Sequence, residues 1–159
     1  MTDLIATQDS DFLWMLGEGD GPPGLRLPPG GVDTPQSLQI VRAIHAAARA
    51  EGRVGAWMMI SDGEVVGLCG AARAQGRGSE MEIGYGVAAG RRRLGHATRA
   101  IGAMIALARA EPELTCLTAV TATDNLPSQA VLGRHGFSEV AREHRDEDGD
   151  VVIWRLALR

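Results

Sequence analysis

Residues 80–108 read EMEIGYGVAAGRRRLGHATRAIGAMIALA, and along this stretch the pattern changes from that of a strand to that of a helix. The first part, residues 80–88, predicts a strand that contains Gly84 and Gly86. After it the apolar residues recur at helical spacing, and Pro112 ends the predicted helix. The buried face of that helix is expected to consist of Ala97, Ala100, Ile101, Met104, Ile105 and Ala108. A connection rich in arginine and glycine joins the two elements.

The segments on either side predict a chain that mixes strands and helices. Before this stretch we expect a strand and a helix within residues 3–16, a glycine- and proline-rich loop at 17–35, a helix that begins after Thr34 and ends at Gly52, and strands at 56–60 and 64–72 joined by Asp62-Gly63. A glycine-rich connection at 75–79 leads to the strand at 80–88, so these three strands are expected to form an antiparallel meander. After the stretch we expect a strand at 115–121, a helix at 125–135 closed by Gly136, and a hairpin of strands 137–144 and 151–158 around Asp148-Gly149.

The composition excludes several classes of protein. A length of 159 residues suits one domain, residues 1–159. The net charge of −4 and the aromatic content of 4% disfavour binding to nucleic acid, which calls for a basic face or for stacking surfaces. Cys69 and Cys116 lie in apolar runs and are expected to be buried free thiols in a reducing compartment. The N-terminus lacks a positively charged secretion signal and no apolar run approaches ~18 residues, so we expect a soluble, cytoplasmic protein without a membrane segment.

The connection at residues 91–97, RRRLGHA, has the features of an anion-binding loop. The first turn of a helix has unpaired backbone N–H groups, a glycine there allows close approach of a ligand, and arginines add positive charge. The segment therefore suits a pyrophosphate, although it lacks the Gly-Lys-Ser/Thr ending of a nucleotide P-loop. The alternative is a solvated run of arginines before an ordinary helix. The four histidines have no spacing typical of a metal site, so we expect no metal.

Two motifs resemble those of the GNAT superfamily of acetyltransferases. Residues 92–97, Arg-x-x-Gly-x-Ala, match the superfamily's Arg/Gln-x-x-Gly-x-Gly/Ala signature, and Glu82-Ile83-Gly84-Tyr85 precedes it. Residues 125–137, Asn-x-x-Ser-x-x-Val-Leu-x-x-x-Gly-Phe, resemble the second motif of the branch that includes ribosomal-protein amino-terminal acetyltransferases. The resemblance implies a single N-acetyltransferase domain of the mixed α+β class with the GNAT fold. That fold is a central, twisted, mostly antiparallel sheet of about seven strands, splayed in the middle and flanked by about four helices.

The resemblance also implies that acetyl-CoA is the cosubstrate. Backbone amides of residues 92–97 would hold its pyrophosphate, Thr98 would add a hydroxyl, and the backbone of Val87 would meet the pantetheine and the thioester oxygen. Asn125 and Ser128 would lie along the pantetheine and adenosine, although Asn125 can equally be a helix N-cap. The residues expected to bind the cofactor are Tyr85, Gly86, Val87, Arg92, Arg93, Leu94, Gly95, His96, Ala97, Thr98, Asn125 and Ser128.

Acetylation of an amine requires a group that accepts a proton, because an ammonium has no free lone pair. Glu82 is the candidate base, directly or through water, and on a strand it shares a face with Glu80, whose charge would raise the pKa of one of the pair. The alternative is that both glutamates form a solvated strand face. The family's tyrosine acid is replaced by Leu132, which leaves Ser128, water or Tyr85 to protonate the thiolate. Tyr85 lies three residues after Glu82, an odd spacing on a strand, so its side chain is expected on the opposite face of the strand and in the core.

The expected function is acetyl transfer from acetyl-CoA to a primary amine of a protein N-terminus or a small molecule, by direct attack in a ternary complex. The alternative is an acyl-CoA-binding sensor or docking module with the same fold and little turnover, which the missing tyrosine favours. The loop at residues 17–35 is a candidate for the acceptor side of the site. A homodimer is compatible with the family, and the sequence does not identify the acceptor.

Overall fold

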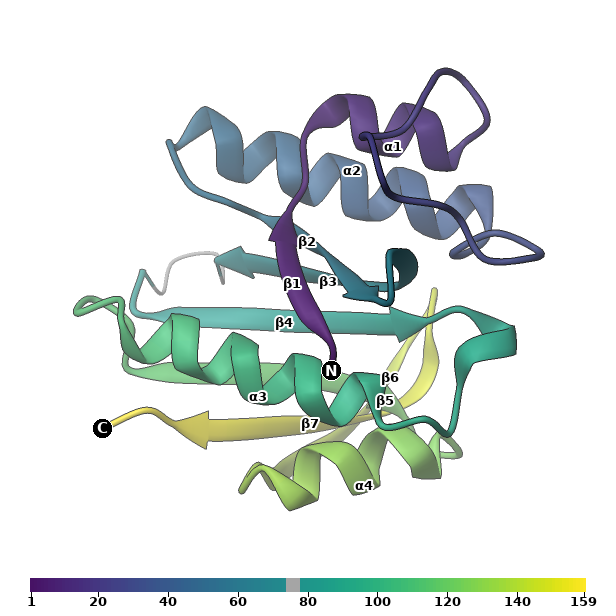
Figure 1. Cartoon of the computed structure of the whole chain (residues 1–159). Coiled ribbons are helices and arrows are strands. Elements are labelled where there is room, and N and C mark those ends of the chain that lie inside the picture. The colour runs from purple at the N-terminus through teal and green to yellow at the C-terminus, as the bar shows by residue number, and fades with distance from the viewer. Residues whose placement is uncertain (74–77) are drawn as a thin grey trace. The chain divides into compact units, whose positions relative to one another are not determined.

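A computed structural model of the chain describes residues 1–73 and 78–159, and its elements follow the predicted order (Figure 1). They are β1 (Asp3–Ala6), α1 (Asp9–Met15), α2 (Pro35–Ala50), β2 (Ala56–Ser61), β3 (Glu64–Arg73), β4 (Glu80–Val87), a short 3-10 helix (Ala89–Arg91), α3 (His96–Arg109), β5 (Cys116–Ala122), α4 (Leu126–Arg134), β6 (Ser138–Arg145) and β7 (Gly149–Ala157). Of these, only the 3-10 helix was not expected. The predicted connection at 75–79 lies largely outside the described residues.

Seven strands of the described chain form one sheet in the order β1-β2-β3-β4-β5-β7-β6. The pairs β1–β2, β2–β3, β5–β7 and β6–β7 are antiparallel, whereas β4 and β5 are parallel. The parallel register joins only Glu80–Glu82 to residues 116–118, although both strands continue beyond it. The mixed α+β fold with a mostly antiparallel sheet is thereby confirmed, and the short register agrees with a splayed sheet.

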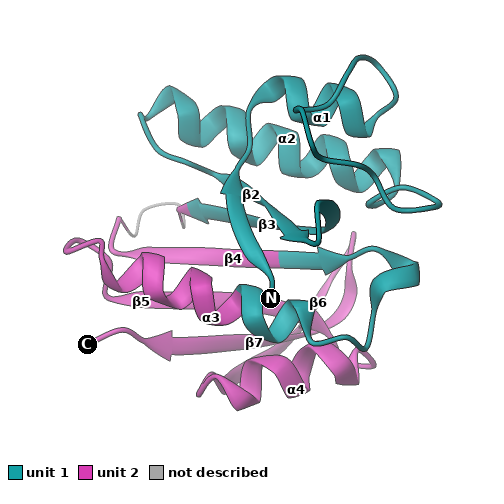
Figure 2. Cartoon of the chain, viewed as in Figure 1, with its two compact units in different colours: residues 1–72, 85–100 teal, residues 73–84, 101–159 magenta. Residues whose placement is uncertain are grey.

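The chain divides into two compact units, which Figure 2 shows in different colours. The first unit contains residues 1–72 and 85–100, and the second contains residues 73–84 and 101–159. The boundary runs through β4 and through α3, so each unit holds a part of both elements. That the whole chain acts as one N-acetyltransferase domain stays a prediction.

The first unit is built on the helices α1 and α2, which lie side by side (Figure 1). Thr34 caps α2 as expected, because its hydroxyl accepts a hydrogen bond from the Ser37 N–H at 3.2 Å, and Pro35 occupies the first turn. At the β2–β3 turn, Asp62 and Gly63 both have positive φ, 50° and 74°, as a two-residue hairpin of this composition requires. The hydrophobic core of the first unit contains Phe12, Met15, Val32, Leu38, Ala56, Met58, Ile60, Val65 and Leu68.

The second unit is built on the β5–β7–β6 ladder and the helix α4. Asn125 caps α4 through a 3.3 Å hydrogen bond from the Ser128 N–H to its side-chain oxygen, which confirms the N-cap interpretation. Trp154 is buried on β7, and its Nε1–H donates to the Thr121 hydroxyl at 3.0 Å.

No helix within the described residues is long and apolar enough to cross a membrane.

Both cysteines are buried and free, as expected from their apolar surroundings. Burial raises the pKa of Cys69 to about 12, so its thiol stays protonated at neutral pH. Neither thiol has the exposure of a reactive cysteine, and their role is to fill the interior.

Candidate active site

The end of β4 lies unusually close to β3 within the first unit. A Cβ built at Gly67 of β3 would be 2.4 Å from the carbonyl oxygen of Gly86 and 3.1 Å from the Cα of Val87. Only a glycine at position 67 leaves room for this approach, because both neighbours are backbone atoms that cannot rotate away. The backbone of residues 86 and 87, which the resemblance implies would lie beside the pantetheine, is therefore positioned by a glycine on the neighbouring strand.

The connection from β4 to α3 contains two left-handed residues in quick succession. Arg93 has φ 65° and Gly95 has φ 81°, and α3 begins directly afterwards at His96. A non-glycine residue in this conformation is strained, and such strain is concentrated at ligand-binding sites. Alternation of left- and right-handed residues turns successive N–H groups toward one side and forms an anion-binding concavity. Arg92, Arg93, Leu94 and Gly95 are all exposed, so the connection is open to a ligand.

Side chains of the first unit hold this connection in place. The Arg99 guanidinium donates to the carbonyl oxygen of Leu94 at 2.8 Å, and a Cβ at Gly95 would be 2.9 Å from its Nη1. Arg92 Nε donates to the carbonyl oxygen of Val87 at 3.3 Å. The loop geometry is thus fixed from both ends, by α3 and by β4.

His96, which is expected to bind the cofactor, does not offer its side chain to a ligand. Its ring is buried, and Nδ1 lies 2.8 Å from the Thr2 hydroxyl, which also accepts a hydrogen bond from Arg99 Nε at 2.9 Å. Burial, assisted by the charge of Arg99, lowers the pKa of His96. The ring therefore anchors the N-terminal residues to α3, and only the backbone of His96 stays a candidate for contact with a phosphate.

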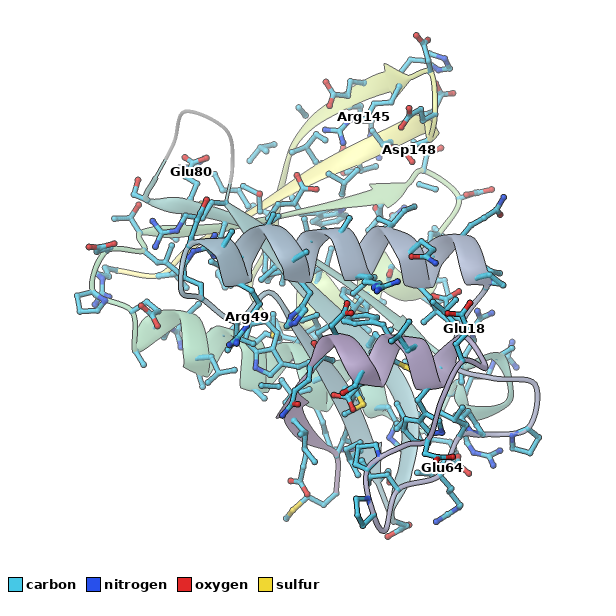
Figure 3. All side chains as sticks on the ribbon, turned by 90° about the horizontal axis from the view of Figure 1, so that it is seen from above. Glu18, Arg49, Glu64, Glu80, Arg145 and Asp148 are labelled. Atoms are coloured by element: carbon cyan, nitrogen blue, oxygen red, sulfur yellow. The ribbon has the colours of Figure 1, made fainter. Side chains whose placement is uncertain are left out.

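A buried carboxylate holds Arg91, at the start of the connection from β4 to α3, against β3. Glu64, the first residue of β3, is almost fully buried and labelled in Figure 3. Its carboxylate accepts hydrogen bonds from Arg91 Nε at 2.5 Å and Nη2 at 3.1 Å, and Arg26 Nε lies 3.6 Å away. The sequence did not point to this cluster, in which one arginine comes from the loop at residues 17–35 and the other from the segment after β4.

Replacing Glu64 with glutamine is expected to destabilise the protein at neutral pH by about 1 kcal/mol, because a half-buried guanidinium loses its charged partner. The Arg91 guanidinium holds the pKa of Glu64 below its ordinary value of 4.5. The ion pair of Glu64 with Arg91 therefore stabilises the folded protein at pH values above the ordinary pKa of 4.5. This stabilisation is lost as the pH falls through the lowered pKa of the folded state. Urea unfolding at pH 7 and between about pH 5 and 3 gives the free energy of unfolding of both proteins across this range.

The matched control is Glu139→Gln, because Glu139 forms a similar pair with Arg142 on the exposed strand β6. That change is expected to leave the unfolding midpoint nearly unchanged, since exposed pairs contribute little. Equal effects of the two substitutions, or a Glu64 effect that persists at the lowest pH, would show that the ion pair of Glu64 with Arg91 does not stabilise the fold.

The two glutamates of β4 are in different environments, in contrast to the expected carboxylate pair. Glu80, labelled in Figure 3, is buried, and its Oε1 lies 2.8 Å from Arg155 Nη2 on β7. Glu82 is exposed and faces Thr118 of β5 in the parallel register. Because Arg155 pairs with Glu80, the two carboxylates are not equivalent, and the expected effect of one on the other stays a prediction. Glu82 stays a candidate base on its exposure and position alone.

The remaining predicted residues are divided between the units. Tyr85, Ala97 and Thr98 belong to the first unit and are half-buried, so Tyr85 is not the core residue that alternation suggested. Asn125 and Ser128 belong to the second unit, at the start of α4. Leu132, at the position of the family's tyrosine, is fully buried. No three His, Cys, Asp or Glu side chains gather as metal ligands in residues 1–73 and 78–159.

The first unit also contains a pocket of about 490 Å³ that none of the predicted site residues lines. Its walls come from β1, the start of α1, residues 20–25 and Met58 of β2. Asp11, one of its polar residues, is buried and already accepts a hydrogen bond from the Gln8 N–H at 2.7 Å. None of residues 91–97, the predicted pyrophosphate site, lines this pocket.

The comparisons with known proteins identify the family of this chain. A family model described as an acetyltransferase (GNAT) domain matches residues 25–138, which is most of the chain. The chain belongs to the GNAT family of acetyltransferases. The resemblance seen in the sequence motifs is thereby confirmed. No curated protein matches the chain as a relative.

Similar solved structures include GNAT enzymes with different acceptors. The aminoglycoside acetyltransferase AAC(6')-Ib in complex with coenzyme A is 16% identical, with a TM-score of 0.72 over 99% of this chain and 95% of that one. RimL, a ribosomal L7/L12 alpha-N-protein acetyltransferase in complex with coenzyme A, is 15% identical, with a TM-score of 0.71 over 98% and 93%. RimJ of Mycobacterium smegmatis, in complex with a CoA disulfide, is 22% identical, with a TM-score of 0.71 over 98% and 81%. At these identities the likeness establishes the fold.

Proposed function

We propose that this protein transfers an acetyl group from acetyl-CoA to a primary amine of a protein N-terminus or a small molecule, by direct attack in a ternary complex. The observation that carries the proposal is the connection into α3, where Arg93 and Gly95 are left-handed and the arginines at 92 and 93 are exposed. This arrangement offers N–H groups and positive charge to a pyrophosphate. Family membership and the CoA or acetyl-CoA in similar structures support the same function.

The residues present fit this cosubstrate. Backbone amides of residues 92–97 would hold the pyrophosphate, with a further hydroxyl from Thr98, and the backbone of residues 85–87 would accompany the pantetheine. Asn125 and Ser128 would contact the pantetheine and adenosine side. Acetyl-CoA itself supplies an activated thioester, which needs no metal.

In the proposed reaction the neutral amine nitrogen bonds to the acetyl carbonyl carbon as the carbon–sulfur bond breaks. Glu82 accepts the proton that the nitrogen loses, directly or through a water molecule. The departing thiolate takes up a proton from Ser128 or water, because Leu132 offers none. A thiol with an ordinary pKa near ~8.5 is a tolerable leaving group, so the missing tyrosine does not preclude turnover.

The buried Leu132 is also the observation that favours the second candidate, an acyl-CoA-binding sensor with little turnover. In that case CoA binds and no amine is acetylated.

For either function, the two buried free thiols favour a reducing compartment such as the cytoplasm. The acceptor classes named for RimL and for AAC(6')-Ib, a protein N-terminus and an aminoglycoside, are both candidates for this chain.

The experiment that tests the proposal measures release of the CoA thiol from acetyl-CoA in the presence of panels of peptides and small amines. We expect release that depends on the amine concentration, with the acetylated amine identified by mass spectrometry. Tight binding of CoA without release in either panel would instead support the sensor.

A further inference from the structure

The loop at residues 17–35 ends in a carboxylate that lies against β4. Asp33 Oδ2 is 3.4 Å from the position that a Cβ would take at Gly86. Gly86 is one of the residues that the proposed function places beside the pantetheine arm. Both residues belong to the first unit, so their proximity is a property of that unit alone.

The carboxylate is held in place by the start of α2. Its other oxygen, Oδ1, accepts a hydrogen bond from the backbone N–H of Thr34 at 2.7 Å. Thr34 is itself the N-cap of α2, followed by Pro35 in the first turn. Further back in the loop, the N–H of Arg26 donates to the carbonyl oxygen of Gly63 at 3.0 Å. Asp33 is therefore presented by backbone that is fixed on both sides.

The charge of Asp33 has no partner in the described part of the chain. Some acidic residues of the first unit pair with arginines, as Asp9 does with Arg42 at 2.7 Å and Glu64 with Arg91 at 2.5 Å. In residues 1–73 and 78–159 no basic side chain pairs with Asp33, which is exposed. A fixed, exposed and uncompensated carboxylate favours a cationic ligand.

We propose that Asp33 is an acceptor-binding residue, whose carboxylate accepts a hydrogen bond from a positively charged amine acceptor and holds it beside Gly86. The inference rests on the proposed function and narrows its substrate class to amines without a carboxylate next to the amino group. Peptide N-termini and polyamines meet this condition, whereas free amino acids place a second negative charge near Asp33. Proton removal stays with Glu82, so Asp33 contributes to binding of the acceptor.

The test compares Asp33→Asn with the unchanged protein in the thiol-release assay, with putrescine, spermidine, a peptide amide and free alanine as acceptors. We expect the amine KM of Asp33→Asn to rise at least about tenfold for the first three acceptors, the loss of one charge-assisted hydrogen bond. The KM for acetyl-CoA and the thermal midpoint should not change. Asp33→Glu should recover part of the affinity, because it keeps the charge.

Asp3→Asn is the matched control, since Asp3 is another exposed aspartate of the first unit and should leave all constants unchanged. An unchanged amine KM in Asp33→Asn, or an equal rise in the acetyl-CoA KM, would overturn the inference. Preference for free alanine over the three cationic acceptors would overturn it as well. Absence of thiol release from the unchanged protein with every acceptor would show that the proposed function itself fails, and the inference with it.

Discussion

Replacing Glu82 with glutamine is expected to lower kcat for acetyl transfer at least about 100-fold, the usual contribution of a positioned general base. The amide occupies almost the same volume and cannot accept the proton that the amine must lose. Because Glu82 is exposed on β4 and has no predicted contact with the cofactor, the affinity for acetyl-CoA should not change. Thiol-release kinetics give kcat, and calorimetric titration gives the dissociation constant.

The pH dependence separates loss of a base from general damage. As the pH approaches the pKa of the amine, ~10, neutral amine forms without a base. The difference in kcat between the Glu82→Gln variant and the unchanged protein should therefore become smaller. Glu111→Gln is the control, since Glu111 is an exposed glutamate that follows α3 in the same unit. A kcat for Glu82→Gln equal to that of the unchanged protein would remove Glu82 as the base.

Replacing Gly67 with alanine is expected to weaken acetyl-CoA binding at least about tenfold, equivalent to 1.4 kcal/mol. The new methyl group would meet the carbonyl oxygen of Gly86 at 2.4 Å, so β4 must move at the residues that the account places beside the pantetheine. Overpacking of this kind also costs about 1–3 kcal/mol of stability. Calorimetric titration and urea unfolding measure the two effects separately.

Gly70→Ala is the matched control on the same strand. A Cβ there would meet its nearest atoms, in Gly55 and Val41, at an ordinary distance of 3.8 Å. We therefore expect Gly70→Ala to bind acetyl-CoA normally. Comparable binding by the Gly67→Ala protein would mean that the close approach of β3 to β4 is not needed for the cofactor.

The features that sequence reasoning predicted well are those determined by neighbouring residues. The caps Thr34 and Asn125 and the turn Asp62-Gly63 follow from local backbone chemistry, and the structure contains all three. The change from strand to helix after β4 can also be predicted, because the spacing of the apolar residues changes there. Together these local signals predict the order of elements and hence the fold class.

The features that could not be predicted depend on residues far apart in the sequence. His96 was placed in the correct loop, but its partner Thr2 lies 94 positions away, and that contact decides where the ring points. The charge of Glu80 is balanced by Arg155 on β7, which no local pattern reveals. The approach of Asp33 to Gly86 likewise requires the folded loop. Such contacts determine which site residues are available for chemistry.

The most direct measurement compares the binding of acetyl-CoA with that of S-acetylpantetheine, which has the same thioester arm and no pyrophosphate. If the connection between β4 and α3 holds the pyrophosphate, acetyl-CoA should bind at least about 100-fold more tightly in a calorimetric titration, as several charge-assisted hydrogen bonds would provide. Equal affinities for the two compounds, or no binding of acetyl-CoA, would contradict the account.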